Sequence, residues 1–357
     1  MGTTMDPSTL PYKVYDIDPD GDLLLGTKPD HEARWRFRVC SATLRRHSPV
    51  WKTMLFGPWK EAKPTDDSEW VVELPEDPAF EMQTTFHIIH GLFDKVPETM
   101  SINNLFNLLI VLNKYDMTRI VKPWCTQWVL PAEQPLAAVH ALRSMYIAWE
   151  LGHESLFTSR LAEIAMKTEI EGGALVFNDF QDVNLEAQDY LGPSDILDII
   201  REIRKAVIEK MIAPLTADLE ARVKTTPCCT FGNSWEKPER DRSLCDAAVL
   251  GSIYRGMIKQ KGSILPRESS CITESVVQMA SWLFPMMEDI QTPQYHRQCS
   301  LKDKYQKHST TLHGSIPEIV QKFLKPSHKE YMASQRSKTG VASQPGTQIT
   351  QRYWKLT

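Results

Sequence analysis

The sequence lacks the features of a membrane or secreted protein. It has no apolar run of the roughly 18 residues that a membrane-spanning helix needs. Its N-terminus has no basic stretch followed by an apolar run, so we expect no secretory signal. Its seven cysteines are odd in number, which favours reduced thiols over a disulfide framework. These absences predict a cytoplasmic or nuclear protein.

The chain also lacks the short signatures of common enzymes and nucleic-acid binders. It contains no glycine-rich phosphate loop, no G-x-S-x-G elbow and no H-E-x-x-H pair. The net charge of −4 and the absence of a basic cluster beyond Arg45-Arg46 argue against direct nucleic-acid binding. We therefore expect no enzyme, with one alternative. A hydrolase or transferase in the helical region that begins at residue 131 would need a deep pocket that gathers groups such as His140, Glu150 and His153.

The length and the change of pattern along the chain predict an α+β protein of two units. A chain of 357 residues suits two domains. Short strands alternate with helices in the first unit, and helical patterns dominate the second. The expected boundaries are a flexible lead-in at 1–11, a mixed unit at 12–130, an all-helical unit at 131–331 and a disordered tail at 332–357, whose composition is polar.

Within the first unit, β-type and helical periods alternate. Strands are expected at 14–17, 23–25, 35–39 and 71–74. Pro49 marks the first turn of a helix that ends near Leu55. Pro78 opens a helix to about His90, with inward side chains at Phe80, Met82, Phe86 and Ile89. A further helical stripe lies at 105–112, and a short helix begins at Pro123, with Pro131 and Pro135 bounding the unit.

The second unit shows apolar residues at helical spacing. Helices are expected at 137–151, 156–167, 247–259 and 274–287, with a break at Gly152. The strongest stripe consists of Ile196, Ile199, Ile200, Ile203, Val207, Ile208, Met211 and Ile212. Such a stripe is typical of helical core packing; a partner-binding helix is the alternative.

Residues 12–130 resemble the BTB/POZ domain, most closely the fungal type. The family's hairpin pattern matches Asp22, Leu23, Leu24, Phe37, Leu44, Ser48, Trp51, Met54 and Leu55. Longer phrases that are similar to the fungal group lie at Asp18–Leu23, Ser48–Leu55, Gly57–Glu61, Leu74–Pro78, Ile88–Gly91, Asp94–Glu98, Lys114–Asp116 and Pro123–Trp124. The resemblance implies the BTB/POZ fold, a small mixed sheet with helical hairpins, followed here by a helical region.

The resemblance also implies a function in protein–protein interaction. Such modules bridge a substrate to a cullin-type ubiquitin ligase or organise transcription complexes, so the expected partner is a cullin, another protein or a second copy. The corresponding surfaces are 52–61, 105–115 and the extension 137–151, and the contact residues expected there are Trp51, Phe56, Trp59, Phe106 and Tyr115. Val39 and Cys40 stand where many members have Ala–His, and this difference argues against the usual homodimer.

One group of residues in the second unit has the chemistry of a metal site. Cys228 and Cys229 precede a loop rich in Pro and Gly, and Cys245 follows at the start of a helix. His296 and Cys299 form an H-x-x-C pair much later in the chain. Thiolates with an imidazole are ligands of structural zinc. We therefore expect that Cys228, Cys245, His296 and Cys299 can hold a structural zinc ion; small core packing is the other interpretation of Cys245.

Two other patterns favour structural roles. Asp16, Asp18, Asp20 and Gly21 imitate the opening of a calcium loop, but Thr27 stands where the closing Glu is needed. A turn between two strands is therefore expected. His87 and His90 lie one helical turn apart without a nearby acidic or cysteine partner, so hydrogen-bonded helix residues are expected rather than metal ligands.

Overall fold

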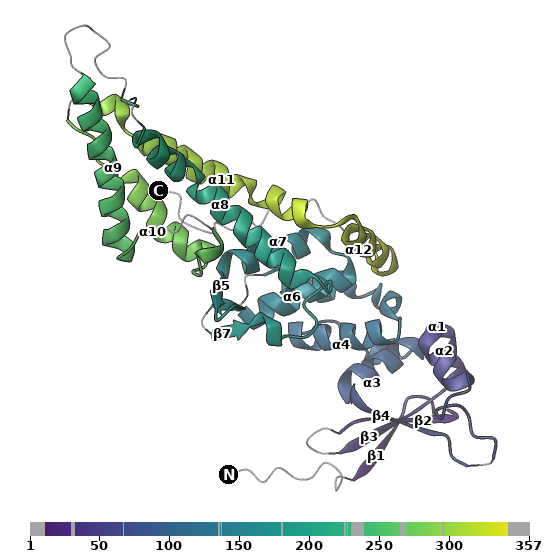
Figure 1. The fold of residues 1–357 in the computed structure, drawn as a ribbon. Coiled ribbons are helices and arrows are strands. Elements are labelled where there is room, and N and C mark those ends of the chain that lie inside the picture. Colours follow the sequence, from purple (N-terminus) through teal and green to yellow (C-terminus); the bar gives the residue numbers. More distant parts are fainter. Residues whose placement is uncertain are drawn as a thin grey trace.

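The fold is α+β, with a four-stranded sheet at one end of an elongated, largely helical body, as the computed structural model shows (Figure 1). The structure describes residues 11–341 except 30–32, 67, 135, 137, 180, 225, 227, 230–238, 265–268 and 295. The predicted lead-in and most of the predicted tail lie outside the described residues. None of the helices in the described ranges combines the length and apolarity that a bilayer span requires.

The first sheet has the strand order β1-β3-β2-β4. Its strands are β1 (Tyr12–Asp16), β2 (Leu23–Lys28), β3 (Arg34–Val39) and β4 (Val71–Pro78). β3 pairs parallel to β1 and antiparallel to β2, and β2 pairs parallel to β4. The alternation predicted for β3 is confirmed, because Phe37 and Val39 are buried. The Phe37 ring packs on that of Phe86, from the helix covering this face.

A helical hairpin follows β3 and is fixed by one serine. Helix α1 (Ser41–His47) leads directly into α2 (Pro49–Phe56), with Pro49 in its first turn as predicted. The Ser48 hydroxyl accepts the Trp51 N–H at 3.0 Å, which caps α2. The same hydroxyl donates to the carbonyl of Tyr115 at 2.6 Å. Ser48 thereby joins the hairpin to a segment 67 residues away in sequence.

Three α-helices and two short 3-10 helices complete the first unit. They are α3 (Ala79–Ile89), η2 (Phe93–Lys95), α4 (Ile102–Lys114), η3 (Thr118–Val121) and α5 (Cys125–Glu133). The buried positions predicted in α3 are confirmed for Met82, Phe86 and Ile89, whereas Phe80 is 44% exposed and that prediction is wrong. Pro131 lies inside α5 rather than beyond it.

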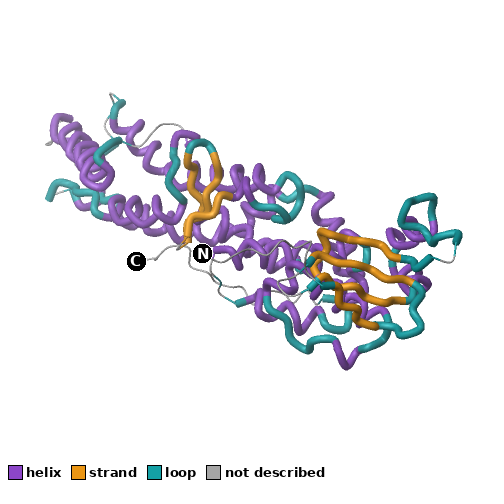
Figure 2. The backbone as a smooth tube through the Cα atoms, turned by 90° about the horizontal axis from the view of Figure 1, so that it is seen from below, coloured by secondary structure: helices purple, strands orange, loops and turns teal. Residues whose placement is uncertain are grey.

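The second unit is not all-helical as predicted. After α6 (Ala138–Leu151) and α7 (Glu154–Lys167), the chain forms a three-stranded sheet of β5 (Thr168–Glu171), β6 (Ala174–Asp179) and β7 (Gln181–Asn184), followed by η4 (Leu185–Ala187). Figure 2 shows this sheet apart from the first one. Gly172 and Gly173 form the β5–β6 turn with φ angles of 58° and 92°, which glycine adopts without strain.

The long helix α8 (Ile196–Arg222) is the central helix of the second unit and contacts α7, α9 (Glu239–Lys261), α10 (Val276–Glu288) and α11 (Lys302–Phe323). All eight apolar residues of its predicted stripe are buried, which confirms the core interpretation. Helix α8 also contacts η5 (Ser269–Cys271), and η6 (Arg297–Cys299) follows α10 in the chain. Within α8, the buried Arg204 donates to the carbonyls of Thr168 and Ile272 at 3.2 and 2.6 Å. Arg204 thereby connects α8 to β5 and to the residue that follows η5.

Two final helices correct the prediction of a tail from residue 332. Helix α11 (Lys302–Phe323) packs against α8, and α12 (Pro326–Thr339) packs against α6 and η3. Met332 and Thr339 are buried, and the Thr339 hydroxyl donates to the Leu151 carbonyl at 2.8 Å. Residues 332–339 are therefore helical, and α12 returns to the first unit. The buried apolar residues form one continuous cluster from Ile17 to Val341.

Candidate metal centre

Four potential metal ligands converge from three separate segments of the second unit. Cys229 follows α8, Cys245 belongs to α9, and His296 and Cys299 lie at η6. Their ligand atoms all lie within 4.8 Å of one another. The Cys229 Sγ is 3.1 Å from His296 Nδ1 and 3.5 Å from Cys299 Sγ. Cys229, Cys245 and His296 are buried, and Cys299 is half-buried.

Three of the four predicted zinc ligands belong to this cluster, and Cys228 is replaced by its neighbour Cys229. Cys228 is exposed and lies outside the cluster. The Asp246 carboxylate fixes the backbone of both cysteines and so determines which of them enters the cluster. Its Oδ2 accepts the N–H of Cys228 at 2.6 Å and of Cys229 at 3.4 Å. No feature of the sequence distinguishes two adjacent cysteines before the loop is folded.

Local hydrogen bonds place the other ligands. The His296 N–H donates to the Pro293 carbonyl, and the Cys299 N–H donates to the His296 carbonyl, each at 2.8 Å. These bonds close a tight turn that brings both side chains to one side. The Gln291 N–H donates to Ser252 Oγ at 2.9 Å, and this bond holds the segment before the turn against α9.

The donor set fits a zinc ion. Three sulfurs and one imidazole nitrogen match the Cys₃His type of structural zinc site, with bonds of about 2.3 Å to sulfur and 2.0–2.1 Å to nitrogen. Without a cation, burial raises the pKa of the Cys245 thiol, and the neighbouring Cys229 and Cys299 raise it further. A bound cation reverses this effect by stabilising thiolates. The cluster therefore can hold a metal ion.

A chain of charged contacts surrounds the centre. The Asp246 carboxylate lies 3.8 Å from Arg222 Nε, and Arg222 Nη1 lies 3.3 Å from Asp218. Asp218 in turn accepts hydrogen bonds from Lys304 Nζ at 2.7 Å and from the Tyr305 hydroxyl at 2.6 Å. The contacts thus connect α9 to the end of α8 and to the start of α11.

The five predicted protein-contact residues divide by burial. Phe56 and Trp59 are exposed, at 43% and 58% of their surface. Phe106 is half-buried and packs edge-on against Tyr146. Trp51 and Tyr115 are buried and stack at 4.3 Å between ring centroids, so both belong to the core and are not available to a partner.

Two of the three groups named for the alternative enzyme, Glu150 and His153, hold neighbouring elements together. Glu150 accepts hydrogen bonds from Asn113 at 2.8 Å and from the Tyr331 hydroxyl at 3.0 Å, which joins α6 to α4 and α12. The ring of His153 caps the start of α7 by accepting the Leu156 N–H, and its Nε2 lies 3.2 Å from Glu133. Glu150 and His153 therefore both have structural partners.

Of the two histidines predicted to be hydrogen-bonded helix residues, His90 has such contacts, whereas the buried Nε2 of His87 has no hydrogen-bond partner among the described residues. His90 Nε2 accepts the Cys40 N–H at 3.1 Å, and its Nδ1 lies 3.0 Å from the Phe86 carbonyl. The interpretation of His90 as a hydrogen-bonded helix residue is confirmed. Asp18 accepts the N–H of Asp20 through its side chain and of Gly21 through its carbonyl, as expected of a turn.

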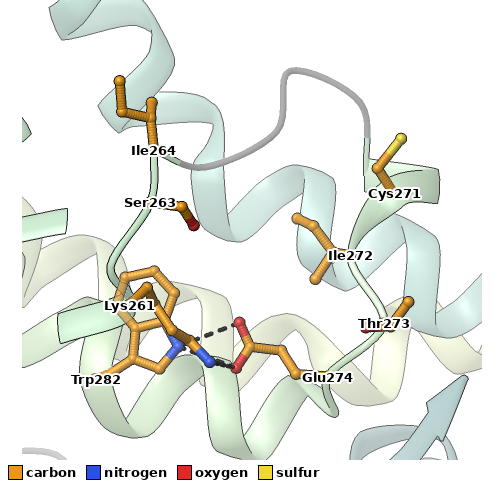
Figure 3. Close-up of a pocket in the computed structure, with 8 residues that line it drawn as sticks. All are labelled: Lys261, Ser263, Ile264, Cys271, Ile272, Thr273, Glu274 and Trp282. Atoms are coloured by element: carbon orange, nitrogen blue, oxygen red, sulfur yellow. Dashed lines mark hydrogen bonds and ion pairs between the residues drawn. The ribbon is translucent and has the colours of Figure 1, made fainter. Parts of the chain in front are cut away.

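A small pocket beside η5 has a polar wall whose groups satisfy one another (Figure 3). Glu274 pairs with Lys261 and accepts a hydrogen bond from the Trp282 indole at 3.1 Å. Ile264, Ile272 and Cys271 also line the pocket. The pocket thus presents no unpaired acid or base from its described residues.

Comparisons of the chain with models of protein families, with curated proteins and with solved structures find no match. The function proposed for the metal centre therefore rests on the positions and chemistry of its own residues.

Proposed function

We propose that the chain is a non-enzymatic scaffold for protein–protein interaction, built on a BTB-like unit and stabilised at its far end by a structural zinc ion. The convergence of Cys229, Cys245, His296 and Cys299 within 4.8 Å carries this proposal. Four protein ligands fill a tetrahedral zinc site and leave no position for a substrate or a reactive water. The ion would therefore hold helices together rather than catalyse a reaction.

The order of elements in the first unit supports its relation to the BTB/POZ fold. A mixed sheet, the α1–α2 hairpin, a further strand and the helices α3 to α5 follow one another as the resemblance implies. The residues of the matching phrases also have structural roles, since Ser48 caps α2 and Leu44, Trp51 and Leu55 are buried. The element order and these residue roles both support the proposal that residues 12–130 form a BTB-like module.

The partner surface is proposed at the end of α2. Phe56 and Trp59 are exposed there, and the Arg45 guanidinium lies 4.7 Å from the centre of the Phe56 ring. Aromatic and arginine side chains are enriched at protein interfaces because they bury a large area with few degrees of freedom. A protein partner would bind at this surface. The partner would be a cullin-type ligase subunit or a component of a transcription complex, and the chain would act in the cytoplasm or the nucleus.

Metal analysis of the full chain, purified without chelators, tests the zinc proposal. We expect about one zinc ion per chain. Cys229→Ser should lose the ion, and Cys228→Ser should keep it because Cys228 lies outside the cluster. A folded wild-type chain without metal, or equal loss from both variants, refutes the structural zinc.

Affinity purification from the host cell, combined with light scattering, tests the scaffold. We expect a protein partner whose recovery falls at least tenfold in a Phe56→Ala/Trp59→Ala variant. Phe93→Ala provides the matched control, since Phe93 is equally exposed, at 60%, on η2. A monomer that captures no partner, or equal capture by all variants, refutes a partner surface at the end of α2.

A further inference from the structure

The three thiols of the metal centre differ in how easily an oxidant can reach them. Cys245 is 1% exposed and Cys229 is 3% exposed, whereas Cys299 is half-buried at the end of η6. Thiolate character and access together determine which cysteine is oxidised first. A zinc ion would keep all three sulfurs as thiolates, so access decides among them. Cys299 is the sulfur that a small oxidant in solvent meets first.

The neighbour that can complete the reaction with Cys299 is Cys229. The two sulfurs lie 3.5 Å apart, and a disulfide needs about 2.05 Å between them. Cys229 lies in an irregular segment and Cys299 in a three-residue 3-10 helix, so the backbone of both can move by the missing 1.5 Å or so. Cys245 belongs to the regular helix α9, whose hydrogen bonds oppose such a shift.

We propose that Cys299 is an oxidative modification site, at which hydrogen peroxide converts the Cys229–Cys299 pair to a disulfide and expels the metal ion. This inference rests on the zinc centre proposed above. It adds a regulatory property to that centre, because the ion would leave under oxidising conditions and return under reducing ones.

The reaction proceeds in two balanced steps. The Cys299 thiolate attacks one oxygen of the peroxide, the O–O bond breaks, and hydroxide departs. Cys299 is then a sulfenic acid. The Cys229 thiolate then attacks the Cys299 sulfur, the S–O bond breaks, and a second hydroxide leaves. The two sulfurs lose two electrons, and the peroxide gains them.

The ion is lost because the disulfide removes two of its four ligands. Cys245 and His296 alone cannot retain a zinc ion in competition with water, and the freed Cys245 sulfur takes up a proton from solvent. The Asp246 carboxylate still holds the N–H groups of Cys228 and Cys229, so the loop stays near α9 after oxidation. A reductant such as dithiothreitol therefore restores a site that is ready to bind zinc again.

Zinc release from the metal-loaded full chain tests this proposal. Hydrogen peroxide should release about one zinc ion per chain into a colorimetric chelator. Peptide mass spectrometry should find Cys229 joined to Cys299, with Cys245 trapped as a free thiol. Cys228→Ser and Cys271→Ser are the matched controls, because both residues are exposed and lie outside the cluster; each variant should release zinc as the wild type does.

The possible outcomes separate the two proposals. A wild-type chain that contains no zinc refutes the zinc centre itself. A chain that contains zinc but retains it at peroxide concentrations that oxidise Cys271 overturns the modification site and leaves the zinc centre intact. Release accompanied by a disulfide to Cys245, or by a mixed disulfide through Cys228, also overturns the assignment to the Cys229–Cys299 pair.

Discussion

Two buried glutamates should respond to pH in opposite directions. Burial raises the pKa of Glu150, and hydrogen bonds from Asn113 and Tyr331 offset only part of this increase. Burial also acts to raise the pKa of Glu163, but hydrogen bonds and charges of Arg160 and Lys167, at 2.7 and 3.1 Å, outweigh it and lower the pKa. Replacement of each residue by glutamine removes the ionisation and keeps the shape.

The sign of each effect follows from proton linkage. The raised folded-state pKa of Glu150 contributes stability below its unfolded-state pKa, and this contribution is lost as pH rises through the folded-state value. At pH 7 the buried carboxylate is a cost, so Glu150→Gln should raise the free energy of unfolding by about 1 kcal/mol, with a smaller gain at pH 5.

Glu163 has the opposite linkage. Its lowered folded-state pKa contributes stability above its unfolded-state pKa, and this stability is lost as pH falls through the folded-state value. Arg160 is 2% exposed, and Glu163→Gln leaves it without a buried counter-charge. The free energy of unfolding of the variant should therefore fall by about 2–4 kcal/mol at pH 7. The loss is smaller than for complete removal of one partner of the ion pair, because glutamine keeps a hydrogen bond.

Urea unfolding of the zinc-loaded chain at several pH values between 5 and 8 measures both effects. The quantity of interest is the difference between each variant and the wild type at the same pH, because pH effects on the metal centre are common to all three proteins. If the two variants shift stability in the same direction at pH 7, the assignment of Glu150 as a buried cost and Glu163 as a buried ion-pair partner is wrong.

Three further variants at buried positions and one exposed control test the packing, with stability measured by urea unfolding. Trp51→Ala should cost about 3–5 kcal/mol because Trp51 is fully buried, whereas Trp59→Ala should change stability by less than about 0.5 kcal/mol. Gly152→Ala should cost more than about 1 kcal/mol and speed hydrogen exchange in α12, since its φ is +74° and a Cβ would meet the α12 backbone. Arg204→Met should cost about 3 kcal/mol, because it leaves the carbonyls of Thr168 in β5 and of Ile272, which follows η5, without the Arg204 donor. A wild-type value for any of the three buried positions contradicts the corresponding contact.

The sequence predicted elements whose side chains follow a regular period. The α8 stripe and the α1–α2 hairpin are observed because apolar spacing and Pro49 report directly on local structure. The β5–β7 sheet was missed because its strands are short and carry polar residues on one face. The Gly172-Gly173 pair between Ile170 and Ala174 was the available signal of a hairpin.

The second half of α12, from residue 332, was predicted as tail because its burial depends on polar side chains. Gln335 and Thr339 are 3% and 0% exposed, and the Gln335 amide donates to Glu150 at 3.3 Å. Such contacts form only after α6 and α12 meet, and the sequences of these helices do not report them. The choice of Cys229 over Cys228 has the same origin, since it depends on the carboxylate of Asp246, a residue of another helix.

The location of the metal centre separates its role from that of the proposed partner surface. Helix α9, which carries Cys245, lies at the end of the molecule opposite the sheet of β1–β4 (Figure 1). The contacts around the centre run from Asp246 through Arg222 and Asp218 to the start of α11, and none of them reaches the first unit. Loss of the ion should therefore loosen α9 and η6 and leave Trp59 unchanged. If chelation abolishes partner capture while the sheet end keeps its hydrogen-exchange protection, the partner binds at the metal end. Capture that persists after chelation and depends on Trp59 places the partner at the end of α2.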